Sequence, residues 1–527
     1  MTRSRDDNVR VVIVGSGIAG LCAAARLAHH GPRVLVLERH ATPGGKMRSL
    51  PSAAGPVDAG PTVLTLRGVF DELFHDLGER LEDHLTLIPQ RILARHFWPD
   101  GSRLDLHDTE DDSAEAIRAF AGSRAAAQFR TFSARARTLF NGFDAPVMQA
   151  PAPSLPGLAA HVMRNPHLLR PMAPLSTLAD VLNHSFDDPR LAQLFGRYAT
   201  YVGGSPYHVP GLLALIWQAE AAGVWVVHGG MHRLACALQD LAQARGAEFR
   251  FGAHVERIEA TPQDGTRAVL LADGTRIPAD TVLFNGDPKA LATGALGPDC
   301  AHVAPQTRAA PRSLSAEVWA FAATPQGPDL AHHNVFFRDD PKSEFDALDR
   351  GALVPDPTLY VCAQDRGQPG PSGAPERFEI IANAPPLQDA PHKEDHEQCQ
   401  TRTFRTLARF GLTFDPTPEA AALTTPAGFD RLFPASDGSL YGQSPHGMTA
   451  AFKRPTARTA IPGLYLAGGG THPGAGVPMA ALSGRHAVAA IMQDRTSIST
   501  SRKTAMPGGT STGSAPTGAA RSASSRS

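Results

Sequence analysis

The sequence contains few cysteines, almost no net charge and no long apolar run. Its five cysteines are far apart and form no CxxC pair, which argues against a disulfide framework and favours a reducing compartment. The 50 lysines and arginines balance 51 aspartates and glutamates, so no overall field favours nucleic acid or an anionic membrane. No window offers the roughly 18 uninterrupted apolar residues of a spanning helix. What remains is a 527-residue chain, 42% hydrophobic, long enough for several domains.

The first residues, MTRSRDDNVR, make a poor signal peptide, because Asp6 and Asp7 are acidic and a strand follows directly. We therefore expect a cytoplasmic protein. The predicted strand is the β-branched run 11–14, and a helical pattern follows from Gly17 until Gly31 and Pro32 interrupt it. A second strand, residues 33–37, then ends on Glu38.

Between the first strand and the helix lies the turn Gly15-x-Gly17-x-x-Gly20. Glycines permit close approach of a pyrophosphate to free N–H groups at the helix N-terminus, and the Glu38 carboxylate can accept from ribose hydroxyls. The context predicts a dinucleotide site. Glu38 also disfavours a 2′-phosphorylated nucleotide, although Arg39 adjoins it.

A second glycine-rich segment decides between FAD and NAD. Residues 463–478 read GLYLAGGGTHPGAGVP, another strand followed by glycines and the start of a helix. A long cofactor such as FAD needs backbone approach and N–H donors well beyond the pyrophosphate, whereas a short nicotinamide site does not. We therefore expect FAD.

The expected fold class is α/β, with a Rossmann-like FAD-binding domain, a mixed α+β substrate domain and a helical insertion. The FAD-binding part comprises 1–75, 236–300 and 456–496. Residues 76–235 read as a largely helical, substrate-binding and membrane-facing region, and residues 301–455 as the substrate domain. Residues 497–527, rich in Ser, Thr, Gly and Ala, have the composition of a disordered tail.

Several segments together resemble a known family. GSGIAGL, GGKMRS, DAGPTVLT, NGDP and LYLAGGGTHPGAGVP are similar to the bacterial phytoene desaturase-type carotenoid desaturases, FAD enzymes of the amine-oxidase-like flavoprotein superfamily. GPTVLTLR, ARHFWPDGSRLDL, YVGGSPY and LLALIWQAEAAGVWVVHGGM resemble the branch of hydroxyneurosporene (1-hydroxycarotenoid 3,4-) desaturases and methoxyneurosporene dehydrogenases. The resemblance covers the chain to about residue 495.

The resemblance implies a set of FAD contacts: the first turn, Glu38 at the ribose, Val255 at the adenine, and groups toward the ring. These residues are Gly15, Gly17, Ala19, Gly20, Glu38, Lys46, Thr62, Val63, Val255, Asn285, Leu440, Gly468, Ala475 and Gly476. It also implies that the reaction forms the C3–C4 double bond of an acyclic 1-hydroxy or 1-methoxy carotenoid, in spheroidene- or spirilloxanthin-type carotenoid biosynthesis.

No catalytic residue is assigned. A hydride leaving carbon beside a polyene produces a delocalised cation, so the next proton is acidic and a weak base or water suffices. The conceivable acid/base groups are Tyr441, His208, His446, His472 and Glu220, and for each of them an ordinary structural role is favoured. Aromatic residues that could line a polyene tunnel are Tyr201, Tyr207, Trp217, Trp225, Trp319, Phe336 and Phe337.

We expect no metal site, because the spacing His392-x-x-x-His396-x-x-Cys399 lies in a charged, solvated stretch. We expect a hydrophobic carotenoid partner, no nucleic acid, and peripheral association with the inner face of the cell membrane, where the segment 211–217 with Trp225 could dip into one leaflet or form an ordinary buried helix. The electron acceptor, oxygen or a quinone, is open. The alternatives are a phytoene desaturase, another flavin oxidase or polyene saturase, and a non-enzymatic isoprenoid-binding escort-type protein.

Overall fold

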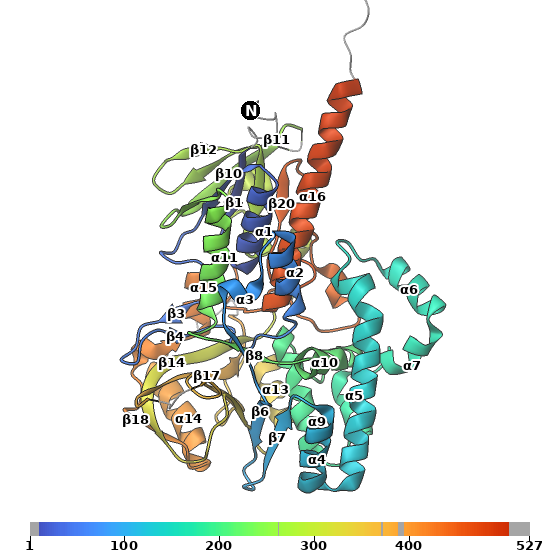
Figure 1. The fold of residues 1–527 in the computed structure, drawn as a ribbon, viewed down its shortest axis with the longest axis vertical. Coiled ribbons are helices and arrows are strands. Elements are labelled where there is room, and N and C mark those ends of the chain that lie inside the picture. The colour runs from blue at the N-terminus through green and yellow to red at the C-terminus, as the bar shows by residue number, and fades with distance from the viewer. Residues whose placement is uncertain (1–9, 262, 370–372, 388–394, 505–527) are drawn as a thin grey trace, which may run out of the picture.

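The computed structural model describes residues 10–261, 263–369, 373–387 and 395–504. Figure 1 shows an upper part that contains the first strand and the long helix α16, and a lower part that combines a large sheet with a group of helices. The N-terminal and C-terminal stretches of the chain therefore meet in the same part of the molecule.

A five-stranded parallel sheet forms the centre of the upper part. Its order is β20-β13-β1-β2-β9, from strands β1 (Arg10–Val14), β2 (Arg33–Leu37), β9 (Glu248–Arg250), β13 (Thr281–Phe284) and β20 (Leu464–Leu466). The three central strands are almost continuous apolar runs because helices and a second sheet cover both faces. This is the Rossmann-like arrangement that the sequence predicts.

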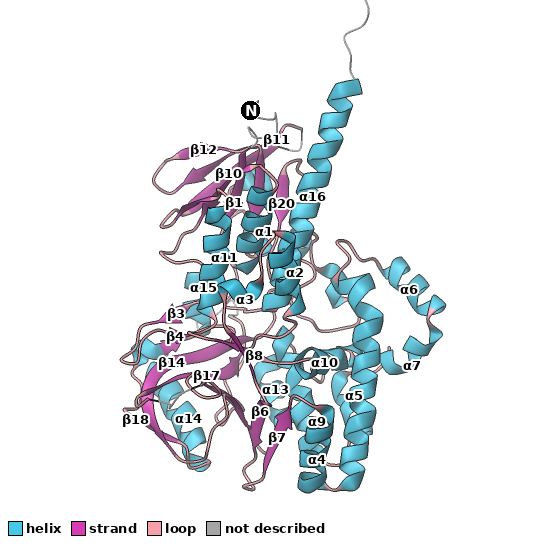
Figure 2. Ribbon diagram, in the orientation of Figure 1, coloured by secondary structure: helices cyan, strands magenta, loops and turns pink. Residues whose placement is uncertain are grey.

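Helices pack on one face of this sheet and a small antiparallel sheet on the other (Figure 2). The helices of this part are α1 (Ile18–His29), α2 (Gly68–Asp76), α3 (Leu81–His84), α11 (His232–Ala244), α12 (Pro288–Ala292) and α16 (Val477–Thr504). The small sheet has the order β10-β11-β12, from β10 (Val255–Thr261), β11 (Gly265–Leu271) and β12 (Arg276–Pro278). Helix α16 continues past residue 497, where the tail was predicted to begin, and residues 505–527 lie outside the described part.

The lower part contains an eight-stranded mixed sheet. Its order is β18-β14-β17-β16-β15-β6-β7, with β19 also paired to β14, from strands β6 (Ile92–Phe97), β7 (Arg103–His107), β14 (Ser315–Gln326), β15 (His333–Phe336), β16 (Leu359–Ala363), β17 (Glu376–Ala384), β18 (Thr413–Asp415) and β19 (Leu423–Thr424). The helices of this part are α13 (Pro341–Asp349), α14 (His396–Arg409) and α15 (Pro426–Leu432).

The stretch 76–235 is less purely helical than predicted. It contributes β6 and β7 to the large sheet, and β5 (Leu87–Pro89) pairs with β8 (Trp225–Val227). Strand β6 is buried on both faces and so lacks the alternation that would have revealed it. A further two-stranded ribbon joins β3 (Ser49–Leu50) to β4 (Val57–Asp58).

The remaining residues of this stretch form helices that pack beside the sheet. They are α4 (Glu110–Ala121), α5 (Ser123–Phe143), α6 (Leu155–Arg164), α7 (Leu169–Met172), α8 (Leu178–Ser185), α9 (Pro189–Gly196) and α10 (Ile216–Ala221), with the short turns η2 (Asp144–Met148), η4 (Arg197–Val202) and η5 (Gly211–Leu215). Helices α6 and α7 stand away from the rest at the right of Figure 1, and we call residues 155–175 the helical arm.

Candidate functional site

One cavity of about 890 Å³ reaches from the parallel sheet into the helices and large sheet below it. Its glycine half is lined by the first turn, by residues 37–47, 60–65, 253–255 and 284–296, and by the loops 429–441 and 468–480. Its helix–sheet half is lined by residues 179–207 and by the sheet-side residues between Val318 and Asn383. All the predicted cofactor-contacting residues line this cavity except Gly20.

Gly20 acts through packing. A Cβ added there would lie 2.3 Å from the carbonyl oxygen of Gly15 and 2.6 Å from Asn285 Nδ2. Only glycine therefore lets α1 approach β1 and β13 this closely. The N-cap residue Gly17 has no side chain that could accept from the first turn of α1. The backbone N–H groups of that turn therefore remain available to an anion.

Glu38 is 4% exposed and lies at the end of β2. Its Oε2 accepts hydrogen bonds from the Ser16 amide and hydroxyl, both at 2.8 Å, and its Oε1 accepts from the His40 amide at 2.9 Å. These bonds hold the carboxylate beside the first turn. Val255, at the start of β10, lines the same part of the cavity.

Asn285 connects the first glycine turn to the second. Its Nδ2 donates to the carbonyl oxygen of Gly15 at 3.1 Å, and a Cβ added at Gly468 would lie 3.1 Å from its Oδ1. Gly468 itself has a φ of +121°, which an L side chain rarely adopts. Residues separated by most of the sequence therefore meet at one amide side chain.

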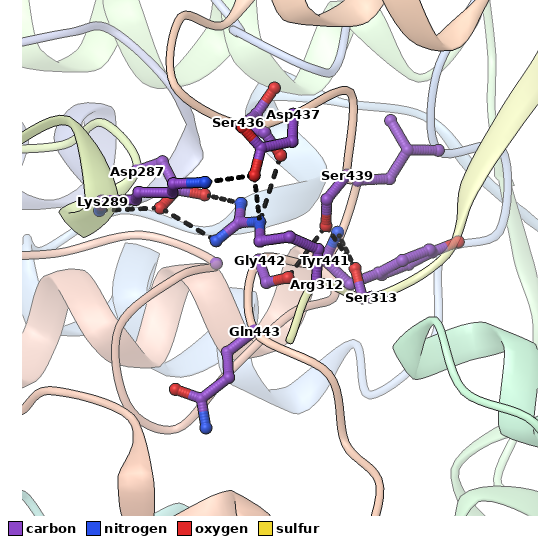
Figure 3. Close-up of polar contacts among 12 residues, drawn as sticks. Asp287, Lys289, Arg312, Ser313, Ser436, Asp437, Ser439, Tyr441, Gly442 and Gln443 are labelled. Carbon is purple, nitrogen blue, oxygen red and sulfur yellow. Dashed lines mark hydrogen bonds and ion pairs between the residues drawn. The ribbon is translucent and has the colours of Figure 1, made fainter. Parts of the chain in front are cut away.

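A buried polar network holds the loop that contains Leu440 and Tyr441 (Figure 3). Arg312 forms an ion pair with Asp287 and donates from Nε to the Ser436 carbonyl oxygen at 3.1 Å. Burial raises the pKa of Asp287, but Arg312, the Lys289 amide and Lys46 together outweigh burial and hold that pKa below its usual value. The network thus ties the NGDP turn after β13 to the 436–443 loop.

Hydroxyl and backbone groups continue this network. The Ser313 and Ser439 hydroxyls are hydrogen-bonded to each other, and the Tyr441 amide donates to Ser313 Oγ at 3.1 Å (Figure 3). Arg454 donates from Nη1 to the Gly469 carbonyl oxygen at 2.7 Å and from Nη2 to that of Tyr441 at 2.9 Å. The second glycine turn and the Tyr441 loop are therefore fixed to each other.

Lys46 is the buried cation of the glycine half. Its Nζ donates to the carbonyl oxygens of Leu440, at 2.5 Å, and Ser439, at 3.3 Å. Burial lowers the pKa of Lys46 to about 8. A negatively charged group bound in this half would favour the protonated form.

These residues fit an FAD molecule. The cavity is lined by the Glu38 carboxylate, by close-approach glycines beside the uncapped N–H groups of α1, and by a second glycine turn. Its volume is at the upper end of the range for small-molecule sites. A nicotinamide site would need no contribution from the distant second turn.

The helix–sheet half is mainly apolar but has a polar group at η4. Tyr198 donates to Glu220 Oε1 at 2.7 Å and Tyr201 to Glu220 Oε2 at 2.6 Å. Arg197 donates from Nη1 to Tyr201 Oη at 2.9 Å. On the sheet side, Tyr360 Oη lies 2.7 Å from Thr62 Oγ1 and 2.6 Å from His333 Nδ1.

Of the conceivable acid/base residues, Tyr441 alone lines the cavity, and burial raises its pKa to about 12. Glu220 is held by two tyrosines, and His208 pairs with Asp349 on the surface. His446 Nε2 accepts from the Ser205 amide at 3.0 Å, and His472 Nε2 lies 2.8 Å from the Ala150 carbonyl oxygen. Structural partners thus account for these four.

Three of the seven aromatic residues suggested for the tunnel line the cavity: Tyr201, Tyr207 and Phe337. The others pack elsewhere. Phe336 stacks on Phe97 and Trp319 packs edge-on against Phe404, because they lie on the opposite face of the large sheet. Trp217 lies in the helical core.

Two buried features of this region, a glutamate and a histidine–cysteine group, have no recognisable signal in the sequence. Glu344, on α13, lines the cavity with its side chain buried, and burial raises its pKa to about 7. His332, His333 and Cys362 form a buried group whose ligand-capable atoms lie within 4.8 Å of one another. Sheet register pairs His333 with Cys362, and such pairing has no local sequence signal. In the motif suggested near Cys399, His392 lies outside the described residues.

The segment 211–217 packs against α5 and its neighbours, as the buried-helix alternative expects. Large exposed apolar side chains occur instead on the helical arm: Leu155, Met163, Leu169 and Leu175. Across the described residues, no helix combines the length and apolar character needed to cross a membrane.

Comparison with known proteins agrees with this geometry. The family model described as flavin containing amine oxidoreductase matches residues 18–492. Hydroxyneurosporene desaturase of Cereibacter sphaeroides is 55% identical, with 93% of this chain and 99% of that protein covered. Its namesake from Rhodobacter capsulatus is 52% identical, with coverage of 92% and 98%. The structure of cyclohexylamine oxidase from Brevibacterium oxydans superposes with a TM-score of 0.56 at 17% identity, covering 93% of this chain and 99% of that one. At that identity the last similarity shows the fold alone.

Proposed function

The chain belongs to the flavin-containing amine oxidoreductase family, and on that premise we propose that it is an FAD-dependent carotenoid desaturase. Its substrate is an acyclic 1-hydroxy or 1-methoxy carotenoid such as hydroxyneurosporene, and the bond formed is C3–C4. The observation that carries this proposal is the single cavity whose glycine half suits the cofactor and whose other half is lined mainly by apolar groups. Such a cavity can place a polyene against the isoalloxazine ring.

The proposed FAD contacts are the thirteen of the fourteen residues named from the sequence that line the cavity, while Gly20 supports them through packing. Glu38 would bind the ribose and Val255 the adenine, while the first turn of α1 would bind the pyrophosphate. Lys46, Leu440 and the second glycine turn lie in the remaining part of the glycine half and would surround the flavin ring.

FAD, when bound, accepts the two electrons that leave the substrate as a hydride. The chain's own residues position the polyene and exclude water. The neutral Tyr441 phenol and the mainly apolar wall offer no strong base, and the acidity of a polyene-stabilised cation removes the need for one. The terminal acceptor is oxygen or a quinone.

The test is to supply hydroxyneurosporene in liposomes to the FAD-reconstituted protein and record the polyene spectrum. A red shift from the added conjugation supports the proposal. Conversion of phytoene alone would identify a phytoene desaturase, and oxidation of an amine another flavin oxidase. A protein that remains colourless with FAD would favour an isoprenoid-binding escort.

We also propose that the enzyme works at a membrane surface, where its substrate dissolves. Residues 155–175 contain Arg164 and Arg170 but no acidic residue, and they carry the four exposed apolar side chains of the helical arm. Replacing Leu155 and Leu175 with serine should reduce flotation with anionic vesicles at least about threefold. The same change at exposed Leu353, outside the arm, is the control; equal flotation of both variants contradicts the proposal.

A further inference from the structure

The polar group at η4 buries an ion pair and two tyrosine hydroxyls where apolar side chains would be enough to fill the space. Arg197, Tyr198, Tyr201 and Glu220 are brought together by α9–η4 and α10, and Arg197 and Tyr201 also line the cavity. Glu220 is 2% exposed and the Arg197 side chain 10%. Burying an ion pair beside an apolar cavity is costly unless its groups are satisfied.

Arg197 has more donors than acceptors. A guanidinium carries five N–H donors, and one of them has a hydrogen-bond acceptor here, Tyr201 Oη. Glu220 Oε1 lies 3.5 Å from Nη2, an ion-pair contact, and buried Nε has no partner. The rings of Tyr198 and Tyr201 lie 4.8 and 5.3 Å from the guanidinium carbon and fix its plane. The group is thus a preorganised donor without a full set of acceptors.

No other cation lies in this half of the cavity. Among the described lining residues, the lysine and arginine side chains are Arg39, Lys46 and Arg197. The first two lie in the glycine half, next to Glu38 and Leu440. Arg197 is therefore the cation that faces the space left for the substrate.

The chemistry of the substrate requires a donor near the ring. The oxygen is on C1 and the reacting bond is C3–C4, so the oxygen must lie within a few ångströms of the reacting carbons. Thr62, a proposed flavin contact, is hydrogen-bonded to Tyr360, and Tyr360 and Tyr201 both line the cavity and pack against the same apolar cluster. These contacts place the η4 group beside the proposed ring position.

We propose that Arg197, held by Tyr201 and Glu220, binds the C1 oxygen of the carotenoid and so selects hydroxylated or methoxylated ends. The inference rests on the proposed function. Because the guanidinium only donates, it binds a hydroxyl and an ether oxygen equally, which matches a site that accepts both kinds of end.

The test compares kcat/KM for hydroxyneurosporene and for the same carotenoid without the hydroxyl, using FAD-loaded full-length protein. In Arg197→Met the value for the hydroxylated substrate should fall roughly 10- to 100-fold, the loss of one hydrogen bond to a charged group. The value for the deoxygenated substrate should change less than about threefold. The 1-methoxy substrate should lose as much as the hydroxylated one.

Arg190→Met is the matched control, since Arg190 lies on α9 but bonds to Asp188 and Asp100 outside the cavity. Tyr201→Phe removes the hydrogen bond that orients Arg197. It should reduce the ratio of kcat/KM for the hydroxylated substrate to kcat/KM for the deoxygenated one about threefold to tenfold, and it provides the test if Arg197→Met does not fold. Equal losses on both substrates, an unchanged ratio, or failure of both variants to fold would overturn the inference by assigning the group a structural role. A wild-type enzyme inactive on hydroxyneurosporene would instead refute the proposed function.

Discussion

In the glycine half of the cavity, glycine-rich turns form part of the wall, whereas in the helix–sheet half residues of α9, η4, α13 and the large sheet form it. Behind the first turn, the packing tolerates no added atom at Gly20, where a Cβ would lie 2.3 Å from the Gly15 carbonyl oxygen. The helix–sheet half depends on hydrogen bonds that bury charge, as at Arg197 and Glu344. The comparison teaches that an added atom should do most damage at the glycine turns, whereas substitutions in the helix–sheet half should act mainly by altered charge.

The largest effect should come from Gly20→Ala. The new Cβ would force α1 away from Gly15 and Asn285, opening the turn proposed for the pyrophosphate. We expect FAD binding to weaken about 1000-fold, roughly 4 kcal/mol, measured by reconstitution titration. Gly68→Ala, where an added Cβ meets nothing within 4 Å, is the control. Unchanged FAD affinity in Gly20→Ala would break the comparison.

A smaller effect is expected at the network that supports the glycine half. Arg312→Met leaves Asp287 buried without its ion-pair partner, although the Lys289 amide still donates to its Oδ1 at 3.0 Å. We expect about 3 kcal/mol less free energy of unfolding, measured by urea titration. Arg458→Met, which breaks a half-exposed pair with Asp494, should cost less than about 1 kcal/mol. Similar losses in the two variants would show that the Asp287 pair contributes no more than a surface one.

The smallest effect concerns charge in the helix–sheet half. Burial raises the pKa of Glu344 to about 7 from an ordinary value of 4.5, so the folded protein holds a proton that the unfolded chain releases between these values. Stability from this group is present below pH 4.5 and is lost as the pH rises to 7. Wild type should therefore lose about 2 kcal/mol relative to Glu344→Gln between pH 5 and 8.

The control for this pH dependence is Glu115, exposed on α4. Its hydrogen bond to Arg118 lowers its pKa, so Glu115→Gln should show no such divergence from wild type in this window. Urea unfolding titrations at pH 5 and pH 8 measure the free energy of unfolding of both variants and of wild type. If the free energy of unfolding changes equally with pH in Glu344→Gln and in wild type, Glu344 makes no pH-dependent contribution, and the expected role of charge in the helix–sheet half is wrong.

The two halves also differ in how far they could be predicted from the sequence. Gly15, Gly17 and Gly20 form one short motif, and its turn geometry predicts its position. Arg197 and Glu220 belong to separate elements, η4 and α10, that meet only in the folded chain, and Glu344 joins the cavity through α13. Likewise His333 meets Cys362 through strand register, and β6 is buried on both faces. Tertiary pairing decides these contacts, so no local pattern reveals them.

The order of strands in the parallel sheet has a consequence for synthesis. The central strand, residues 10–14, is synthesised hundreds of residues before its neighbour at 281–284, and the edge strand at 464–466 follows later still. The nascent chain must therefore keep this β-branched strand from aggregating while hundreds of residues are added. A complete cofactor pocket can exist only once the edge strand at 464–466 and the glycine turn after it have been made.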